Sequence, residues 1–285
     1  MSSDAQPAAG SGVPTLVIEP SKGWAKLELR ELWRYRELLY FLTWKNILIQ
    51  YKQAVLGIAW AVLNPVLTMI VFTVIFNKLL HVGTGVYNVP YPVFVYAGLL
   101  PWNLFSGSLS SAGMSLVGNS NLITKVYFPR LVIPGSAVLS QLPNFLISFA
   151  VLCVLMVAYR VVPTWHVVFL PFFTLLALVT AVGVSLWLSA LYVLYRDVQY
   201  IIPFLVQIWM YVSFVFIPIS KIPARWVWLF SLNPMTGVIG GFRWALFGEQ
   251  APNSLFWVSA AMVVVVFVSG MYYFRRMERV FADLV

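Results

Sequence analysis

Residues 161–195 read VVPTWHVVFLPFFTLLALVTAVGVSLWLSALYVLY, and no aspartate, glutamate, lysine or arginine interrupts this run between Arg160 and Arg196. An α-helix needs about 20 predominantly apolar residues to cross the hydrocarbon core of a bilayer. The run exceeds that length, so we predict a transmembrane helix within it, at residues 165–192.

The composition of the whole chain extends this conclusion. Of its 285 residues, 61% are hydrophobic and 9% are charged, and the mean hydropathy is +0.87. An ordinary soluble domain is roughly one quarter charged, and its surface needs polar cover that this chain lacks. Lipid must therefore surround most of the chain, which we expect to be an all-α membrane protein. The single cysteine, Cys153, excludes a disulfide framework and a cysteine metal site.

Charge-free stretches predict five further spans, which makes six transmembrane helices in total. We place the additional spans at about residues 54–77, 93–117, 131–159, 199–218 and 254–274. The apolar segment 226–247 is interrupted by Asn233-Pro234 and Gly240-Gly241. Because proline breaks helical hydrogen bonding, we expect an outer re-entrant helical hairpin there instead of a seventh span.

The distribution of charge predicts the orientation. With six spans and a cytoplasmic N-terminus, most of the 18 basic residues fall on the cytoplasmic side, as membrane proteins prefer. A seventh span would move the cluster Arg275, Arg276 and Arg279 outside. Both termini are therefore expected in the cytoplasm. The predicted organisation is a disordered tail (1–21), an interface helix (22–52), a transmembrane domain (53–275) and a short tail (276–285).

The net charge of +9 does not indicate nucleic-acid binding, because the basic residues cluster at the edges of apolar runs. Residues 26–51 read KLELRELWRYRELLYFLTWKNILIQY, which mixes dense charge with bulky apolar and aromatic residues. This pattern favours an amphipathic helix on the cytoplasmic membrane surface, in contact with lipid headgroups; a soluble connector helix is the alternative. The candidate contact residues are Leu32, Trp33, Arg34 and Arg36.

The predicted inner loop 119–130 reads NSNLITKVYFPR and carries more apolar groups than a solvated turn needs. It is typical of a compact helix that docks in a partner's groove, although anchoring at the membrane interface explains the same aromatics. In the second inner loop, Arg196 and Asp197 can cap a helix end or contact a partner. The candidate docking residues of the first loop are Leu122, Thr124, Lys125, Val126, Tyr127, Phe128 and Arg130.

The chain lacks the groups that would power transport. No ionisable residue lies deep in a predicted span, so coupling to a proton or sodium gradient is not expected. The sequence has no GxxxxGK[ST] phosphate-binding loop, and no catalytic Ser-His-Asp set or metal-ligand cluster is recognisable. We therefore expect no enzyme activity, no metal and no cofactor in this chain. Energy must come from another subunit, unless the protein is a passive channel or a scaffold.

Aromatic residues make up 16% of the chain. Several fall in or near predicted spans one, two and five, where they would form a corridor for a polar polymer. Ordinary enrichment of aromatics at bilayer interfaces and in packed cores is the competing explanation. The candidate channel-lining residues are Trp60, Trp209, Tyr211 and Phe214.

Several motifs resemble the ABC-2 type permeases of the polysaccharide and O-antigen export family. The similarity covers roughly residues 20 to 275 and rests on specific strings as well as on the predicted architecture. The strings are YKQAVLG at 51–57, YPVFVYAGLLPW at 91–102, NLITKVYFPR at 121–130, YRDV at 195–198, LNPM at 232–235 and GFRW at 241–244.

The resemblance implies a permease in the bacterial inner membrane that pairs as a homodimer with two ABC ATPase subunits, which bind ATP and Mg²⁺. The implied substrate is an undecaprenyl-linked polysaccharide such as O-antigen or capsule. It also implies that the 119–130 loop and the N-terminal helix contact the ATPase, and that spans one and five line the channel at the dimer seam. The implied exit residues are Asn233, Pro234, Gly241 and Arg243. The alternatives are an ABC-2 exporter of small drugs or lipids, and a passive channel or scaffold.

Overall fold

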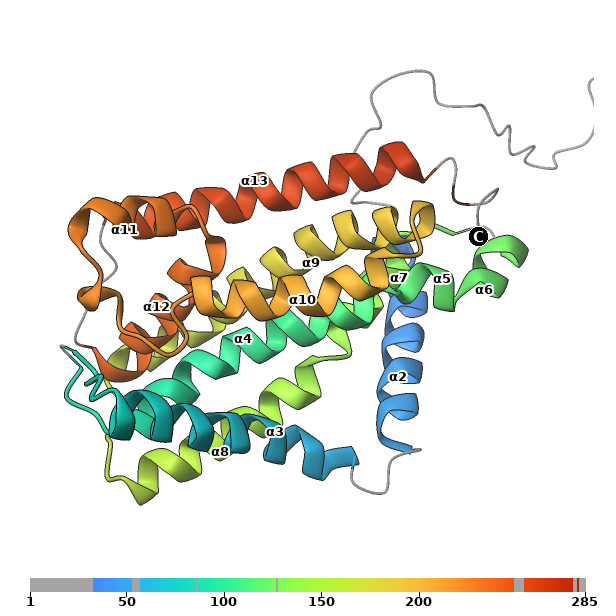
Figure 1. The fold of residues 1–285 in the computed structure, drawn as a ribbon. Coiled ribbons are helices and arrows are strands. Elements are labelled where there is room, and N and C mark those ends of the chain that lie inside the picture. The colour runs from blue at the N-terminus through green and yellow to red at the C-terminus, as the bar shows by residue number, and fades with distance from the viewer. Residues whose placement is uncertain are drawn as a thin grey trace, which may run out of the picture.

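The computed structural model describes residues 33–52, 57–85, 87–126, 128–248, 254–278 and 281. All regular elements in these ranges are helices. Figure 1 shows the longer helices side by side along one direction, with α2 crosswise at one end. The elements are α2 (Arg36–Lys52), α3 (Gly57–Phe72), η1 (Thr73–Leu79), α4 (Tyr91–Gly113), α5 (Ser115–Gly118), α6 (Ser120–Lys125), α7 (Val132–Leu139), α8 (Leu142–Ala158), η2 (Trp165–Phe169), α9 (Leu170–Leu194), α10 (Val198–Val212), η3 (Ile219–Lys221), α11 (Ala224–Ser231), α12 (Pro234–Phe247) and α13 (Ser254–Met277).

Four stretches of helix among the described residues are long and apolar enough to cross a membrane, so the chain is a multi-pass membrane protein. These stretches are Ala59–Leu79, Val132–Ala158, Trp165–Leu194 and Phe256–Met277. The other two predicted spans coincide with α4, which is less hydropathic, and α10, which is apolar but shorter. The six-span topology and its orientation therefore stay predictions.

Two predicted spans need correction in detail. The third coincides with the candidate span Val132–Ala158, but the helix is interrupted within it, because α7 ends at Leu139 and α8 begins at Leu142. Pro143, in the first turn of α8, has no N–H to donate to the Leu139 carbonyl, so the helical ladder stops there. The fifth was expected to reach residue 218, but α10 ends at Val212, and Phe214 adopts a left-handed backbone with φ of 55°.

Helix α4 lies at the centre of the bundle. It packs against α3, α7, α8, α9, α10 and α12, and Phe94, Tyr96 and Phe105 are fully buried in the main hydrophobic cluster. Its sequence is rich in glycine, serine and alanine, which let neighbouring helices approach closely. This composition explains why a deeply buried helix is less hydropathic than the four candidate membrane spans.

Helices α9 and α13 approach at two glycines. A Cβ added to Gly270 would lie 2.2 Å from the Gly183 carbonyl oxygen, and a Cβ added to Gly183 would lie 2.8 Å from the Phe267 Cα. Both distances are below any normal contact. The two backbones therefore touch, as they do where small residues face each other in membrane helices.

The two ends of the bundle differ. At the end that holds α2 and α6, a second hydrophobic cluster joins Leu42, Ile123, Phe128 and Phe274. At the opposite end, where α11 and the start of α13 lie (Figure 1), exposed tryptophans gather. They are Trp165, Trp226, Trp228 and Trp257. Trp33 and Trp44 are exposed at the α2 end as well, and tryptophan is enriched at membrane–water interfaces, which suits an interfacial position for both ends.

Candidate functional site

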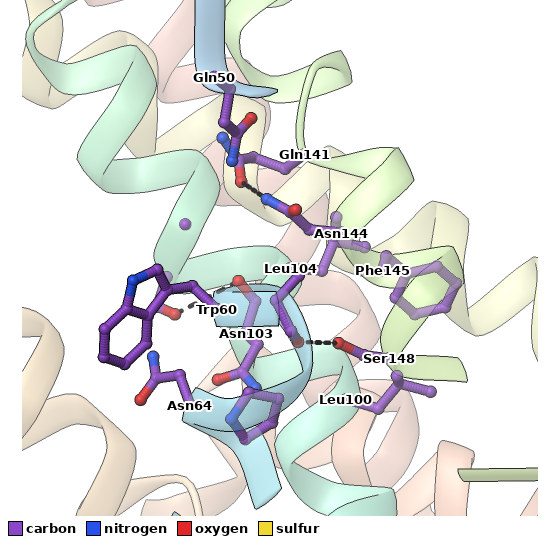
Figure 2. Close-up of a pocket in the computed structure, with 14 residues that line it drawn as sticks. Gln50, Trp60, Asn64, Leu100, Asn103, Leu104, Gln141, Asn144, Phe145 and Ser148 are labelled. Carbon is purple, nitrogen blue, oxygen red and sulfur yellow. Dashed lines mark hydrogen bonds between the residues drawn. The ribbon is translucent and has the colours of Figure 1, made fainter. Parts of the chain in front are cut away.

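A polar cavity of about 270 Å³ lies between α3, α4 and α8, beside the end of α2. Figure 2 shows the side chains that line it. We call it the amide cavity, because five of its lining residues carry carboxamides and one wall is a tryptophan. These residues are Gln50, Trp60, Asn64, Asn103, Gln141 and Asn144.

One wall of the amide cavity is held by side-chain hydrogen bonds. Gln141 Nε2 donates to Ser111 Oγ at 2.8 Å, Asn144 Nδ2 donates to Gln141 Oε1 at 3.0 Å, and Tyr51 Oη donates to Asn144 Oδ1 at 2.6 Å. Gly107 makes room for this network, since a Cβ there would lie 3.0 Å from Gln141 Oε1. The network connects α2, α4 and α8 and fixes the orientation of two of the five carboxamides.

The other carboxamides are unpaired. The side chains of Gln50, Asn64 and Asn103 have no hydrogen-bond partner among the described residues. Trp60 is 56% exposed, and Figure 2 places it with Asn64 and Asn103 toward one end of the cavity. All residues that line the cavity are uncharged. The cavity can therefore hydrogen-bond a neutral polar ligand without attracting an ion.

Sequence reasoning found Trp60 and missed the carboxamides. They come from four separate segments of the chain, and the search for functional groups within the spans considered ionisable residues alone. The available signal was the presence of Asn64 and Asn144 within stretches apolar enough to span a membrane.

The predicted channel aromatics do not form one surface. Trp60 lines the amide cavity and Tyr211 is half exposed. Trp209 instead donates from Nε1 to Asn233 Oδ1 at 2.9 Å and meets Phe105 edge-on, with ring centroids 5.0 Å apart. Phe214 meets Phe230 edge-on at 4.6 Å. Trp209 and Phe214 are half-buried and pack against other residues of the chain, so their role in lining a channel stays a prediction.

The predicted exit residues form one connected unit near the tryptophan-rich end. Asn233 caps α12 by accepting from the Met235 N–H at 3.0 Å, and its Nδ2 donates to Ser213 Oγ at 2.9 Å. Pro234 begins α12 and is buried. Gly241 allows Phe173 to pack, since a Cβ there would lie 2.0 Å from the Phe173 Cε1.

Arg243, one of the implied exit residues, has a buried side chain that is 3% exposed. The guanidinium donates to the carbonyls of Phe214, at 3.0 Å, and Val215 just beyond α10. It also stands 3.7 Å from the centroid of the Phe94 ring. Gly98 leaves space for it, since a Cβ there would lie 2.6 Å from Arg243 Nη2. Arg243 thus joins α4, α12 and the end of α10.

The predicted inner docking residues are only partly exposed. Thr124, Lys125 and Val126 are exposed and Leu122 is half-buried, whereas Tyr127 lies outside the described residues. Phe128 is 5% exposed and belongs to the inner hydrophobic cluster, so the expectation that it is offered to a partner is wrong. The Arg130 N–H donates to Glu278 Oε1 at 3.1 Å, which ties the loop to the end of α13.

The remaining inner candidates are exposed. Arg196 and Asp197 lie in the turn between α9 and α10, and Asp197 occupies the cap position of α10 without a side-chain capping bond. On the N-terminal helix, Trp33, Arg34 and Arg36 are exposed, and Arg36 lies 5.6 Å from the Trp33 ring centroid. Leu32 and the rest of 22–32 lie outside the described residues. Figure 1 places α6 and the α9–α10 turn at the same end of the bundle.

Comparison with known proteins places these features in context. The model of the family described as "ABC-2 type transporter" matches residues 37–247. The chain is 33% identical over 256 residues to the O-antigen export system permease protein RfbA of Myxococcus xanthus, covering 88% of this chain and 96% of that protein. It is 28% identical over 254 residues to the protein of the same name from Klebsiella pneumoniae, covering 87% and 95%. It is 23% identical over 251 residues to the polysialic acid transport protein KpsM of Escherichia coli, covering 82% and 91%.

Proposed function

The chain belongs to the ABC-2 type transporter family, and from this membership we propose that it is the membrane subunit of an ATP-driven exporter of lipid-linked polysaccharide. The observation that carries the proposal is the near full-length similarity to permeases named for O-antigen export and to a polysialic acid transport protein. The undecaprenyl-linked glycan crosses the inner membrane, and ATP with Mg²⁺ is bound by two copies of a separate ATPase subunit.

The inner end of the bundle is the proposed contact with the ATPase. Lys125 and Val126 project there from the end of α6, and Arg196 and Asp197 lie at the same end. Two contacts hold the 119–130 loop against the bundle. Phe128 is buried in the inner hydrophobic cluster, and the Arg130 N–H donates a hydrogen bond to Glu278. Because these contacts fix α6 to the rest of the bundle, a movement of the ATPase against Lys125 and Val126 is passed on to α7 and α13.

The proposed homodimer uses the exposed apolar faces of α3 and α10. Large apolar and aromatic side chains are exposed on both helices. These faces contact either lipid or another copy, and a seam between two copies gives the glycan a path across the membrane. The exposed residues are Trp60, Leu63, Leu67, Ile70 and Val71 on α3, and Tyr200, Ile201, Phe204, Ile208 and Tyr211 on α10.

The proposal is tested with the complex of this chain and its ATPase, reconstituted in lipid nanodiscs. Undecaprenyl-linked glycan should stimulate ATP hydrolysis, whereas hydrophobic drugs and phospholipids should not. Stimulation by drugs and not by glycan would favour the small-molecule exporter. Failure of the chain to co-purify with any ATP-binding protein would favour a passive channel or scaffold.

Val126→Asp should uncouple ATP hydrolysis from export. Val126 is 52% exposed, so a charge there does not disturb the core, but it places an uncompensated carboxylate in an apolar docking contact. We expect surface glycan to fall at least tenfold, which corresponds to about 1.4 kcal/mol of coupling, while the amount of folded chain stays unchanged. Surface glycan is measured with a labelled lectin or antibody, and folded chain by size-exclusion chromatography.

Two further variants serve as controls for Val126→Asp. Val126→Thr preserves shape and neutrality and should export normally. Phe128→Ala should instead lower the amount of folded chain, because truncating a buried phenylalanine costs about 3 kcal/mol or more. Normal export by Val126→Asp would remove the exposed tip of α6 from the proposed contact.

A further inference from the structure

The amide cavity lies where unpaired polar groups are costly. Asn64 and Asn144 fall within two candidate membrane spans, Ala59–Leu79 and Val132–Ala158. Asn64 is exposed on the surface of the fold and Asn103 is half-buried, and an amide that faces hydrocarbon without a hydrogen-bond partner is costly. Asn144 is satisfied by Tyr51 and Gln141, but Asn64 and Asn103 have no partner among the described residues. These two amides are therefore poised for a ligand that the chain itself does not provide.

The chemistry of the cavity selects among the parts of a lipid-linked glycan. A carboxamide both donates and accepts hydrogen bonds, which matches a hydroxyl group that does the same. Phosphate is bound in proteins mainly by arginine, lysine and backbone N–H groups, and all lining residues here are uncharged. The apolar lipid chain gains nothing from five carboxamides. A neutral sugar matches, with its hydroxyls on the amides and its C–H face on Trp60.

The volume of the cavity limits the size of its ligand, and its position in the bundle indicates at which side of the membrane the ligand would enter. Its volume of about 270 Å³ is slightly below the range of about 300–1,000 Å³ that is usual for drug-sized ligands, which leaves room for a single sugar ring. Gln50 and Tyr51 at the end of α2 border it, and α2 lies at the end of the bundle where α6 also lies (Figure 1). The site is therefore near the predicted inner leaflet, where substrate would enter.

We propose that the amide cavity binds an uncharged sugar unit of the exported glycan, with Asn64 and Asn103 as the hydrogen-bonding groups and Trp60 as the stacking face. The inference rests on the proposed export function and deepens it. Gln141 and Asn144 act as positioning residues, since their hydrogen bonds hold the cavity wall.

The binding test uses the full chain with its ATPase in nanodiscs and four soluble probes. These are the methyl glycosides of glucose, galactose and N-acetylglucosamine, and the anionic methyl glucuronide, detected by saturation-transfer NMR. At least one neutral glycoside should bind in the millimolar range, and the glucuronide should bind more weakly. The double variant Asn64→Leu/Asn103→Leu keeps the number of side-chain heavy atoms and the branching at Cγ, and it should weaken binding roughly tenfold, since each lost neutral hydrogen bond reduces affinity several-fold.

The matched control is Asn121→Leu, which removes an exposed carboxamide on α6, away from the cavity, and should bind the glycoside as the wild type does. Binding of none of the neutral glycosides, equal binding of the glucuronide, or unchanged binding by the double variant would each overturn the inference. The last result would indicate that the glycoside binds at another place on the complex.

An export assay separates failure of this inference from failure of the proposed function. The double variant should display less than one fifth of the wild-type surface glycan at equal amounts of folded chain. Wild-type export by that variant would overturn the sugar site and leave the exporter intact. Absence of glycan export by the wild-type chain would instead contradict the proposed function, whatever the glycosides bind.

Discussion

Replacing Arg243 with methionine should leave little folded chain in the membrane. The substitution keeps much of the apolar length but removes the donors to the Phe214 and Val215 carbonyls. Hydrogen bonds to a charged group contribute about 1.5–3 kcal/mol each, so losing two of them should lower the free energy of unfolding by about 3–6 kcal/mol. Unfolding in increasing fractions of sodium dodecyl sulfate, followed by circular dichroism, measures this difference.

Arg243→Lys should recover only part of the loss. Lysine carries the charge, but one ammonium group cannot reproduce the planar fork that meets two adjacent carbonyls and lies over the Phe94 ring. The matched control is Arg225→Met on α11, because Arg225 is exposed and lies 5.9 Å from the Trp226 ring centroid. That control should unfold within about 0.5 kcal/mol of the wild type. Equal unfolding of the Arg243→Met and Arg225→Met variants would show that the buried guanidinium does not hold α10 to α12.

The position of Arg243 illustrates why the sequence predicted helices better than contacts. Apolar length between charges located α9 and α13 within a few residues, because crossing a membrane requires a minimum length whatever the helix touches. The same rule used Arg243 only as a boundary between apolar runs, and it did not show that this side chain is buried. Its hydrogen-bond acceptors are the carbonyls of Phe94, Phe214 and Val215, and no local sequence pattern predicts that these three carbonyls lie close together.

The family resemblance was predicted from short strings, and the comparisons confirm it across most of the chain. The resemblance indicated which segments contact the ATPase or line the channel, but it did not predict which side chains of those segments are buried and which are exposed. In the inner loop, Phe128 turns inward and Val126 outward although both are apolar. Hydropathy alone does not separate them, because the distinction depends on α2 and α13 packing against that loop.

The amide cavity escaped prediction for a related reason. Asparagine and glutamine are neutral, so a search for charges within the spans passes over them. Such residues indicate a binding site only when several of them lie close together. Asn64, Asn103 and Gln141 come together only once α3, α4 and α8 are packed. Isolated carboxamides in a membrane helix commonly hydrogen-bond to a neighbouring helix, and it is the unpaired state of two of them that indicates a ligand.

Replacing Gly270 with leucine should separate α9 from α13 and destabilise the fold by more than about 3 kcal/mol. Overpacking a core usually costs about 1–3 kcal/mol, because flexible side chains move aside. Here the new Cβ would lie 2.2 Å from the Gly183 carbonyl oxygen and 3.1 Å from Trp187 Cδ1. Backbone cannot move aside without shifting the whole helix, and the Trp187 ring is held by stacking on Tyr273 at 4.2 Å.

A graded series makes the test of Gly270 specific. Gly270→Ala should already destabilise, because the Cβ alone makes the clash, and Gly270→Leu should destabilise further. Gly240→Ala on α12 is the matched control, since a Cβ there meets nothing within 4 Å and alanine favours helix over glycine by about 1 kcal/mol. Detergent unfolding should therefore rank Gly240→Ala at or above the wild type and both Gly270 variants below it. If Gly270→Ala instead unfolds together with Gly240→Ala, α9 and α13 do not touch through their backbones.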